Sequence, residues 1–218
     1  MTDPLVSVES LTKQFRSGGE TVTVFRGLDL TLADAESLAL MGPSGSGKST
    51  LLNLLSGLDT WSEGRIRLFG EALTSADEAR WTELRRRHIA TVFQEANLMP
   101  AMTLAENLRL RAGLAGRQRP DTDAWLEDLG LGGLGNRFPD QVSGGQRQRA
   151  ALAMAFAMAP RLILADEPTG SLDRRTAARV ADTLFRFQRR YRCPLILATH
   201  DPELAERCDR SFTLGQRD

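Results

Sequence analysis

The residues with the clearest chemistry form one glycine-rich loop. Its sequence is Gly42-Pro43-Ser44-Gly45-Ser46-Gly47-Lys48-Ser49-Thr50. This run matches G-x-x-x-x-G-K-[ST], in which glycines let backbone N–H groups converge on phosphate. Lys48 would reach the β- and γ-phosphates, and the Ser49 hydroxyl would bind Mg²⁺. The loop therefore predicts binding of a nucleoside triphosphate with magnesium. The alternative is a glycine turn that merely ends in Lys-Ser.

Four polar side chains stand where predicted buried strands end, and they could act on that triphosphate. They are Gln94, Asp166, Glu167 and His200. Ligands of an open α/β sheet lie at the carboxyl ends of its strands. Asp166 suits the magnesium shell, and Glu167 can polarise a water. Gln94 could contact the Mg²⁺ or the attacking water. His200 could reach the γ-phosphate, although a lone histidine is more often structural.

Two further groups could complete the binding of a nucleotide. Val142-Ser143-Gly144-Gly145-Gln146 opens a predicted helix, so it offers a second cluster of N–H donors for an anion. A plain capped helix would need Ser143 but not both glycines. Phe15, at the edge of the first predicted turn, could stack on adenine or fill a small core.

Alternating and continuous apolar runs predict the elements that must position these residues. The predicted strands are 5–11, 22–32, 38–41, 64–70, 89–93, 162–165, 194–199 and 211–214. The predicted helices are 49–56, 75–87, 104–110, 122–129, 147–159, one from Asp173 to about Arg190, and a short one after Ala205. A turn around 17–20 joins the first two strands. The run 85–87, three arginines, is interpreted as a solvated face, and the glycine-rich 130–135 as a hinge or a loop.

The composition excludes several classes of protein. The chain has 218 residues and a formal net charge of zero, so no global field draws it to nucleic acid or anionic lipid. Lys13 and Lys48 are the only lysines, which we interpret as a compositional habit. Cys193 and Cys208 fit two inert thiols in a reducing compartment. No signal peptide is predicted, and the longest apolar stretch, 150–159, is too short to span a bilayer. A membrane role would therefore need a partner.

Together these residues resemble the ATP-binding cassette (ABC) ATPases, and the resemblance covers nearly the whole chain. In family order the segments are Walker A (42–50), the Q-loop (Gln94), the signature (142–146), Walker B (162–167), the D-loop (171–173, with Asp173) and the switch histidine (His200). The signature together with Walker B makes the match specific. The stretches 92–94, 98–100, 103–108, 165–173 and 199–201 look most like the ATPases of macrolide-export and lipoprotein-release systems.

The resemblance implies an α/β fold: a P-loop NTPase core with a mostly parallel, RecA-like sheet, an antiparallel β subdomain and an inserted helical subdomain. It implies a single ABC ATPase domain, 1–218, with approximate subdomains. These are 1–35 and 60–72 for the antiparallel β part, 36–59, 73–94 and 160–218 for the nucleotide-binding core, and 95–159 for the helical part with the signature.

The resemblance also implies an ATPase subunit whose ligands are ATP and Mg²⁺. Glu167 and His200 would be catalytic, and Phe15 would stack on adenine. Ser49, Gln94 and Asp166 would hold the metal. Two copies would form a homodimer around two ATP molecules, so that Ser143, Gly144, Gly145 and Gln146 act on ATP bound by the other copy.

The implied partner is an integral membrane permease, with no nucleic acid. Leu98 and Met99 would line its docking groove or close the helical subdomain's own core. The permease would hold the chain, a cytoplasmic protein, at the cytoplasmic face of the inner or plasma membrane. Alternatives are an ABC ATPase without transport, an ATPase that transmits a mechanical signal, or a P-loop kinase or GTPase. An Asn-Lys-x-Asp motif, expected of a GTPase, is missing from the sequence.

Three positions depart from the family pattern. The chain has Ala35-Glu36 where relatives usually have Gly-Glu, and Ala153-Met154-Ala155 where they have Ala-Arg-Ala. It also stops soon after Leu214, so we expect no regulatory extension. Met154 could alter the packing of its helix or the dimer contact.

Overall fold

The computed structural model describes residues 3–17, 20–117 and 121–215. Within these residues a five-stranded parallel sheet has the order β6-β7-β8-β3-β9. Its strands are β3 (Ser37–Met41), β6 (Ile89–Val92), β7 (Leu162–Asp166), β8 (Leu195–Ala198) and β9 (Arg210–Thr213). The carboxyl ends of these strands therefore lie at one edge, where the sequence places Gln94, Asp166 and His200.

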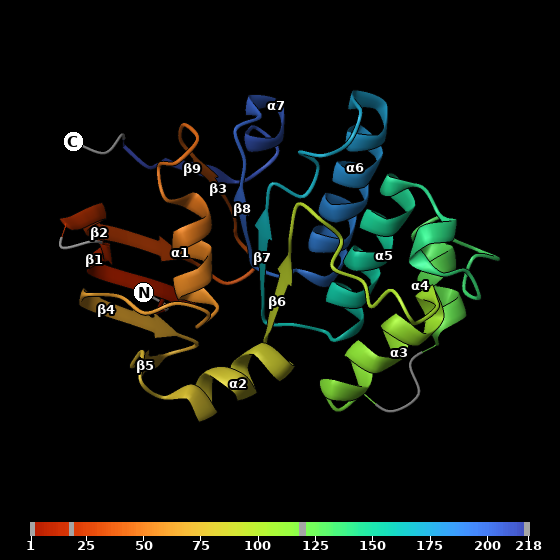
Figure 1. Cartoon of the computed structure of the whole chain (residues 1–218), viewed down its shortest axis with the longest axis horizontal. Coiled ribbons are helices and arrows are strands. Elements are labelled where there is room, and N and C mark those ends of the chain that lie inside the picture. Colours follow the sequence, from red (N-terminus) through yellow and green to blue (C-terminus); the bar gives the residue numbers. More distant parts are fainter. Residues whose placement is uncertain (1–2, 18–19, 118–120, 216–218) are drawn as a thin grey trace.

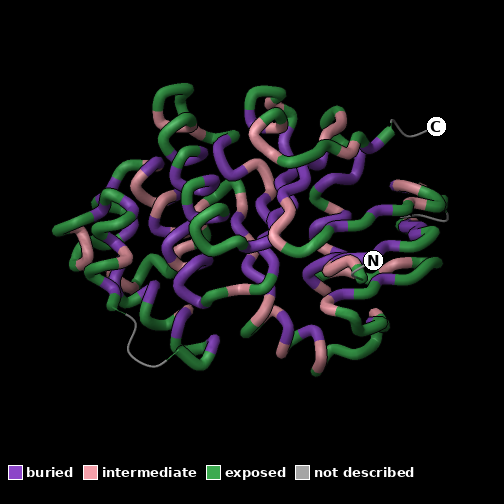
Figure 2. The backbone as a smooth tube through the Cα atoms, turned by 180° about the vertical axis from the view of Figure 1, so that it is seen from behind, coloured by how far each residue is buried: buried purple, intermediate pink, exposed green. Residues whose placement is uncertain are grey.

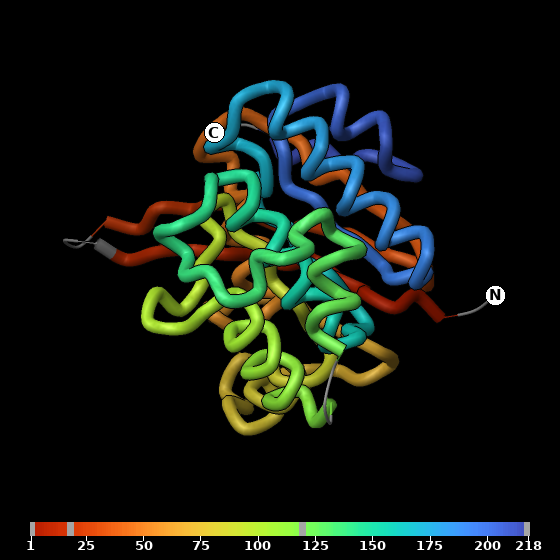
Figure 3. Tube along the Cα trace, turned by 90° about the vertical axis from the view of Figure 1, so that its right-hand side faces the viewer, coloured from red at the N-terminus to blue at the C-terminus, as the bar shows by residue number. Residues whose placement is uncertain are grey.

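A four-stranded antiparallel sheet has the order β2-β1-β4-β5. It consists of β1 (Val6–Ser17), β2 (Glu20–Leu32), β4 (Glu63–Leu68) and β5 (Glu71–Leu73). The first two strands form a long ribbon that projects sideways from the rest of the molecule (Figure 3). The turn predicted around 17–20 falls on residues 18 and 19, which lie outside the described part. The short β5 was not predicted.

The helices surround the parallel sheet. They are α1 (Lys48–Leu55), α2 (Glu78–Arg87), α3 (Leu104–Leu114), α4 (Thr122–Asp128), α5 (Gly144–Ala157), α6 (Arg174–Tyr191) and α7 (Pro202–Ala205), with a 3₁₀ turn at Pro139–Gln141. The antiparallel sheet lies at one end of the long axis and α3 and α4 at the other, with the parallel sheet between them (Figure 1). The predicted α/β class, with a parallel core and an antiparallel sheet, is confirmed.

Two cores cover the two faces of the parallel sheet. Strand residues alternate between them: Leu162 and Leu164 pack with α1 and the antiparallel sheet, whereas Ile163 and Ala165 pack with α3, α5 and α6. The buried segments accordingly run through the middle of the molecule and the exposed ones form its rim (Figure 2). Burial on both faces explains why these strands are continuous apolar runs in the sequence.

Three predicted helix starts were wrong because side chains outside the apolar pattern set them, and the helix predicted over 104–110 continues to Leu114. Helix α2 begins at Glu78 because the Asp77 carboxylate accepts a hydrogen bond from the Arg80 N–H and caps the helix. Helix α5 begins at Gly144, three residues before the predicted start. Helix α7 (Pro202–Ala205) ends where the predicted helix begins, because Asp201 caps it and Pro202 suits its first position.

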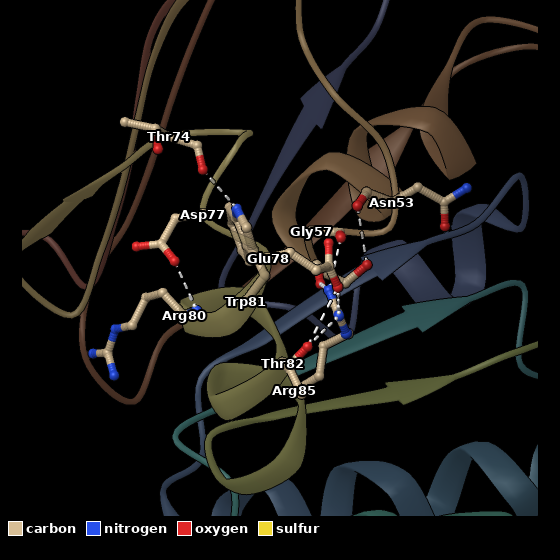
Figure 4. A network of polar contacts seen from close by, with 10 residues as sticks. Asn53, Gly57, Thr74, Asp77, Glu78, Arg80, Trp81, Thr82 and Arg85 are labelled. Atoms are coloured by element: carbon tan, nitrogen blue, oxygen red, sulfur yellow. Dashed lines mark hydrogen bonds and ion pairs between the residues drawn. The ribbon is translucent and has the colours of Figure 1, made fainter.

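The loop after α1 is braced by α2 (Figure 4). Gly57 has φ +66°, and a Cβ there would lie 2.2 Å from the Trp81 ring. Arg85 donates to the carbonyls of Ser56 at 3.3 Å and of Gly57 at 2.7 Å. Arg85 is therefore a half-buried brace and departs from the solvated face interpreted for 85–87. Arg86 and Arg87 are exposed and pair with Glu83, as that interpretation requires.

Ala35 occupies a backbone conformation that favours glycine. Its φ is +60°, in the turn between β2 and β3, and its carbonyl accepts a hydrogen bond from the Gln188 side chain at 3.3 Å. A Cβ in the left-handed region is strained against its own carbonyl. The departure from Gly-Glu at this position therefore lowers the stability of the turn.

Ala35→Gly should raise the free energy of unfolding by about 0.5–1 kcal/mol, because the released strain exceeds the extra entropy of the unfolded chain. Urea denaturation measures the change. The matched control is Ala33→Gly in the same turn, where φ is not positive. That substitution should lower the free energy of unfolding by about 0.5–1 kcal/mol. An equal loss in both variants would contradict the assignment of strain to Ala35.

Candidate functional site

The glycine-rich loop and the strand ends meet around one cavity of about 570 Å³. The residues that line it are Ser44, Gly45, Gly47, Lys48, Ser49, Thr50, Gln94, Glu167 and His200. They come from the loop between β3 and α1, from the first turn of α1, and from the segments that follow β6, β7 and β8. The structure thus places together most of the residues that the sequence proposes for phosphate chemistry.

Two glycines of the loop are required by geometry. Gly42 has φ +144°, and a Cβ there would lie 2.7 Å from Ser46 Oγ and 2.8 Å from the Leu214 carbonyl. Gly47 has φ +98°, and its Cβ would lie 2.6 Å from a methyl group of Val24 on β2. Close packing and positive φ therefore exclude other residues at both positions. Helix α1 begins at the next residue, Lys48.

The Lys48 side chain is hydrogen-bonded to main-chain carbonyls of the glycine-rich loop that precedes it. Its Nζ donates to the carbonyl oxygens of Gly42 at 2.8 Å and Pro43 at 3.2 Å, and it lies 4.0 Å from Glu167 Oε1. Only 8% of the residue is exposed. A buried ammonium in this position could exchange its carbonyl partners for phosphate oxygens, which make stronger charge-assisted bonds.

Asp166 and its neighbours offer oxygen ligands for a hard cation. Asp166 ends β7, and its Oδ1 is buried without a hydrogen-bond partner. Asp166 is not among the residues that line the cavity, whereas Ser49 and Gln94, whose side chains also carry oxygen atoms, are. Among the described residues, no group of three or more His, Cys, Asp or Glu side chains could hold a metal by itself. Mg²⁺ commonly takes one or two protein carboxylates together with substrate phosphates, so this donor set fits magnesium.

Glu167 has a strained backbone and two cationic or polar neighbours. Its φ is +45°, and its N–H donates to the Ala198 carbonyl at 3.0 Å. His200 Nδ1 lies 3.0 Å from Oε1 and 2.9 Å from Oε2 of this carboxylate. Non-glycine residues with positive φ are found at functional sites when the surrounding structure fixes them. Here that geometry directs the carboxylate toward the loop that holds Lys48.

Two residues, Gln148 on α5 and Ser171 of the D-loop, hold the segment of Gln94. Gln148 on α5 is 2% exposed and donates to the Phe93 carbonyl at 2.7 Å, and the Ser171 hydroxyl donates to the Gln94 carbonyl at 3.2 Å. Sequence reasoning missed Gln148. The available signal was a polar residue one turn before Leu152, on the buried face of an apolar helix.

The signature residues Ser143, Gly144, Gly145 and Gln146 lie outside this cavity, at the start of α5. Ser143 Oγ accepts the Gln146 N–H at 3.2 Å, and Gln146 Oε1 accepts the Ser143 N–H at 2.7 Å, which forms a capping box. Gly145 packs against Thr176 of α6, because a Cβ there would lie 2.1 Å from the threonine methyl group. One glycine of the pair therefore has a packing role.

Asp173 and Phe15 also lie outside the cavity. Asp173 caps α6 by accepting the Thr176 N–H at 3.1 Å, and hydrogen bonds from Thr176 lower the pKa of its carboxyl. Phe15 on β1 is 43% exposed, so its ring is not part of a core.

Leu98 packs half-buried against the core of the helical part, whereas Met99 is exposed. The buried Asn107 fixes Met99 by accepting its N–H at 2.7 Å and donating to its carbonyl at 3.1 Å. A cavity of about 530 Å³ is bounded by residues 94–98 and by Pro139, Gly144, Arg147, Gln148, Ser171 and Leu172. Gln94 thus borders both this cavity and the cavity of the glycine-rich loop.

The two cysteines are free, and burial raises the pKa of both thiols to about 12, which agrees with the prediction of inert thiols. In the part of the chain that the structure describes, no helix combines the length and apolarity needed to cross a bilayer.

Comparison with known proteins agrees with these features. The family model described as ABC transporter matches residues 25–170. The ABC transporter ATP-binding protein YbbA of Escherichia coli K12 is 44% identical over 214 residues, which are 96% of this chain and 94% of that protein. The lipoprotein-releasing system ATP-binding protein LolD of Anaeromyxobacter dehalogenans is 45% identical over 216 residues, with coverages of 97% and 90%.

Solved structures give the same result. The dimeric structure of a post-hydrolysis state of the ATP-binding cassette MJ0796, bound to ADP and Pi, superposes with a TM-score of 0.86 at 32% identity. The match covers 96% of this chain and 94% of that one. The chain therefore belongs to the ABC transporter family and is one of its ATP-binding, ATP-hydrolysing subunits.

Proposed function

We propose that two copies of this chain enclose two MgATP molecules and that their hydrolysis drives a separate membrane permease. The observation that carries the proposal is the separation of two halves of a site. Lys48, Glu167 and His200 face one cavity, whereas the signature begins α5 outside it. A second copy can supply the signature to that cavity. MJ0796, the relative of similar structure, is described as a dimer.

In this proposal the chain's residues divide the work at the phosphates. Lys48 and the N–H groups of 42–50 bind the β- and γ-phosphates. Glu167 accepts a proton from the attacking water, and His200 orients the Glu167 carboxylate through the contact at about 3 Å. Ser49, Gln94 and Asp166 would hold Mg²⁺, which neutralises charge on the phosphates when bound.

The remaining predicted residues would bind the base and the second copy. The exposed ring of Phe15 would stack on adenine. Ser143, Gly144, Gly145 and Gln146 would act on the γ-phosphate held by the other copy, with Asp173 beside them in the interface.

The similarity to LolD supports a permease of the lipoprotein-release or macrolide-export type. Leu98, Met99 and the cavity beside them would receive a segment of that permease, and Gln94 would report nucleotide occupancy to it. This would place the chain at the cytoplasmic face of the inner membrane. A neutral net charge favours a protein partner over nucleic acid.

Glu167→Gln keeps the shape of the side chain and removes its basicity. Turnover should fall by about 10²-fold or more while ATP affinity is retained, because the substitution affects only the proton transfer. Phosphate release and equilibrium ATP binding measure the two quantities. The control is Glu83→Gln, a carboxylate on α2 that pairs with Arg86 and Arg87. Near-normal turnover in Glu167→Gln would remove Glu167 from the role of general base.

Substitutions of Lys48 and of Asp166 should lower nucleotide affinity with a different dependence on magnesium. Lys48→Ala should weaken binding of a fluorescent ATP analogue with or without Mg²⁺, because the ammonium contacts phosphate directly. Asp166→Asn should weaken it only when Mg²⁺ is present, because the carboxylate acts through the metal. Equilibrium titrations in magnesium and in a chelator measure both variants. The assignment of Asp166 would be contradicted by an equal loss of affinity in the two conditions.

A shared site should be rescued by mixing two inactive variants. Ser143→Arg blocks the signature and Lys48→Ala blocks the phosphate loop, so a mixed dimer carries both defects in one site and none in the other. ATPase activity of the mixture should therefore exceed that of either variant alone at the same total concentration. A mixture no more active than its components would argue against independent sites shared between copies.

A further inference from the structure

Lys13 is a buried cation with no assigned role. It is one of only two lysines among the 28 lysines and arginines of the chain, and the other is Lys48 of the phosphate loop. Lys13 on β1 is 4% exposed. Its Nζ lies 2.6 Å from Asp59 Oδ1 and 2.6 Å from the Thr60 carbonyl. These two acceptors offset the free energy of removing an ammonium from water.

The same ammonium lies against the ring of Phe15. Lys13 Nζ is 4.2 Å from the ring centroid, within the range of a cation–π interaction. The two residues are two positions apart on β1, so their side chains share a face of the strand. Because Lys13 is buried and Phe15 is 43% exposed, the ring covers the cation and presents its free surface to solvent. A buried cation therefore contacts a partly exposed ring.

The partners of Lys13 connect this ring to the phosphate loop. Asp59 and Thr60 follow α1, the helix that begins at Lys48. The intervening turn is held by the Leu58 N–H, which donates to the Asn53 carbonyl at 2.9 Å, and by Arg85 on the Gly57 carbonyl (Figure 4). Lys13 thus bonds to a braced segment that directly follows the helix whose first turn borders the cavity.

We propose that Lys13 is a positioning residue for the purine base, which holds the ring of Phe15 at a fixed place relative to the phosphate loop. The proposal rests on the proposed role of Phe15 as the adenine platform. A cation on one face draws π density from the other, which favours stacking on a purine whose own face is electron-rich. The compact ammonium can contact a ring, a carboxylate and a carbonyl at once, which the planar guanidinium of arginine does less well.

Isothermal titration of the full chain with ADP and with pyrophosphate, both with Mg²⁺, separates the base from the phosphates. Lys13→Met should lower the affinity for ADP about three- to tenfold and leave the affinity for pyrophosphate unchanged. Phe15→Ala should lower the affinity for ADP in the same selective way. In the Phe15→Ala background, Lys13→Met should cause no further loss, because both substitutions act through one ring.

The control is Gln14→Leu, between the two residues, whose side chain bonds to Thr23 Oγ1 on β2 instead of the ring. It should change neither affinity. If Lys13→Met lowers the affinities for ADP and for pyrophosphate equally, Lys13 has only a structural role and the proposal is overturned. If Phe15→Ala lowers the affinity for ADP and Lys13→Met does not, the role proposed for Lys13 is overturned while Phe15 keeps its role as the adenine platform. If Phe15→Ala leaves the affinity for ADP unchanged, Phe15 does not stack on adenine, and the proposed role of Lys13 is overturned together with that of Phe15. Should Lys13→Met not fold because Asp59 is left unpaired, the same titrations on Lys13→Met with Asp59→Asn decide the question.

Discussion

The structure depends on burying α1 on more than one side. Its four leucines, Leu51, Leu52, Leu54 and Leu55, are each at most 2% exposed. Successive helix positions are 100° apart, so these side chains point in directions that a single sheet cannot cover. The parallel sheet covers one side of α1 and the antiparallel sheet covers another. The antiparallel sheet is therefore a structural requirement of the helix that follows the glycine-rich loop as well as the carrier of Phe15.

Both ends of α1 are fixed by that covering sheet. At the start of the helix, Val24 of β2 packs against Gly47, and after its end Lys13 of β1 bonds to Asp59 and Thr60. The parallel sheet supplies the other half of the geometry, because the ends of β7 and β8 carry Glu167 and His200 to the same cavity. The parallel sheet therefore leads into the glycine-rich loop through β3 and to Glu167 and His200 through β7 and β8, while the antiparallel sheet packs at both ends of α1.

The sequence predicts structure correctly where a pattern is local, or where the topology of a parallel sheet brings distant residues to one edge. The loop 42–50 defines its own strand, turn and helix, and parallel strands necessarily end at one edge. The predictions were wrong where a single capping side chain sets the start of a helix, as Asp77 and Asp201 do. The short strand β5 was not predicted either. Lys13 was visible as one of two lysines but was attributed to composition, because its partners at 59 and 60 are distant in sequence. The division into subdomains and the roles of individual site residues stay predictions.

The hydrogen bonds of Lys48 have a consequence for how the loop can evolve. Its hydrogen-bond acceptors are the main-chain carbonyls of Gly42 and Pro43, which are present whatever side chain stands at 43. No substitution at that position can delete the acceptor itself. The hydrogen bonds that place the Lys48 ammonium therefore depend on the course of the main chain and are robust to substitution at position 43.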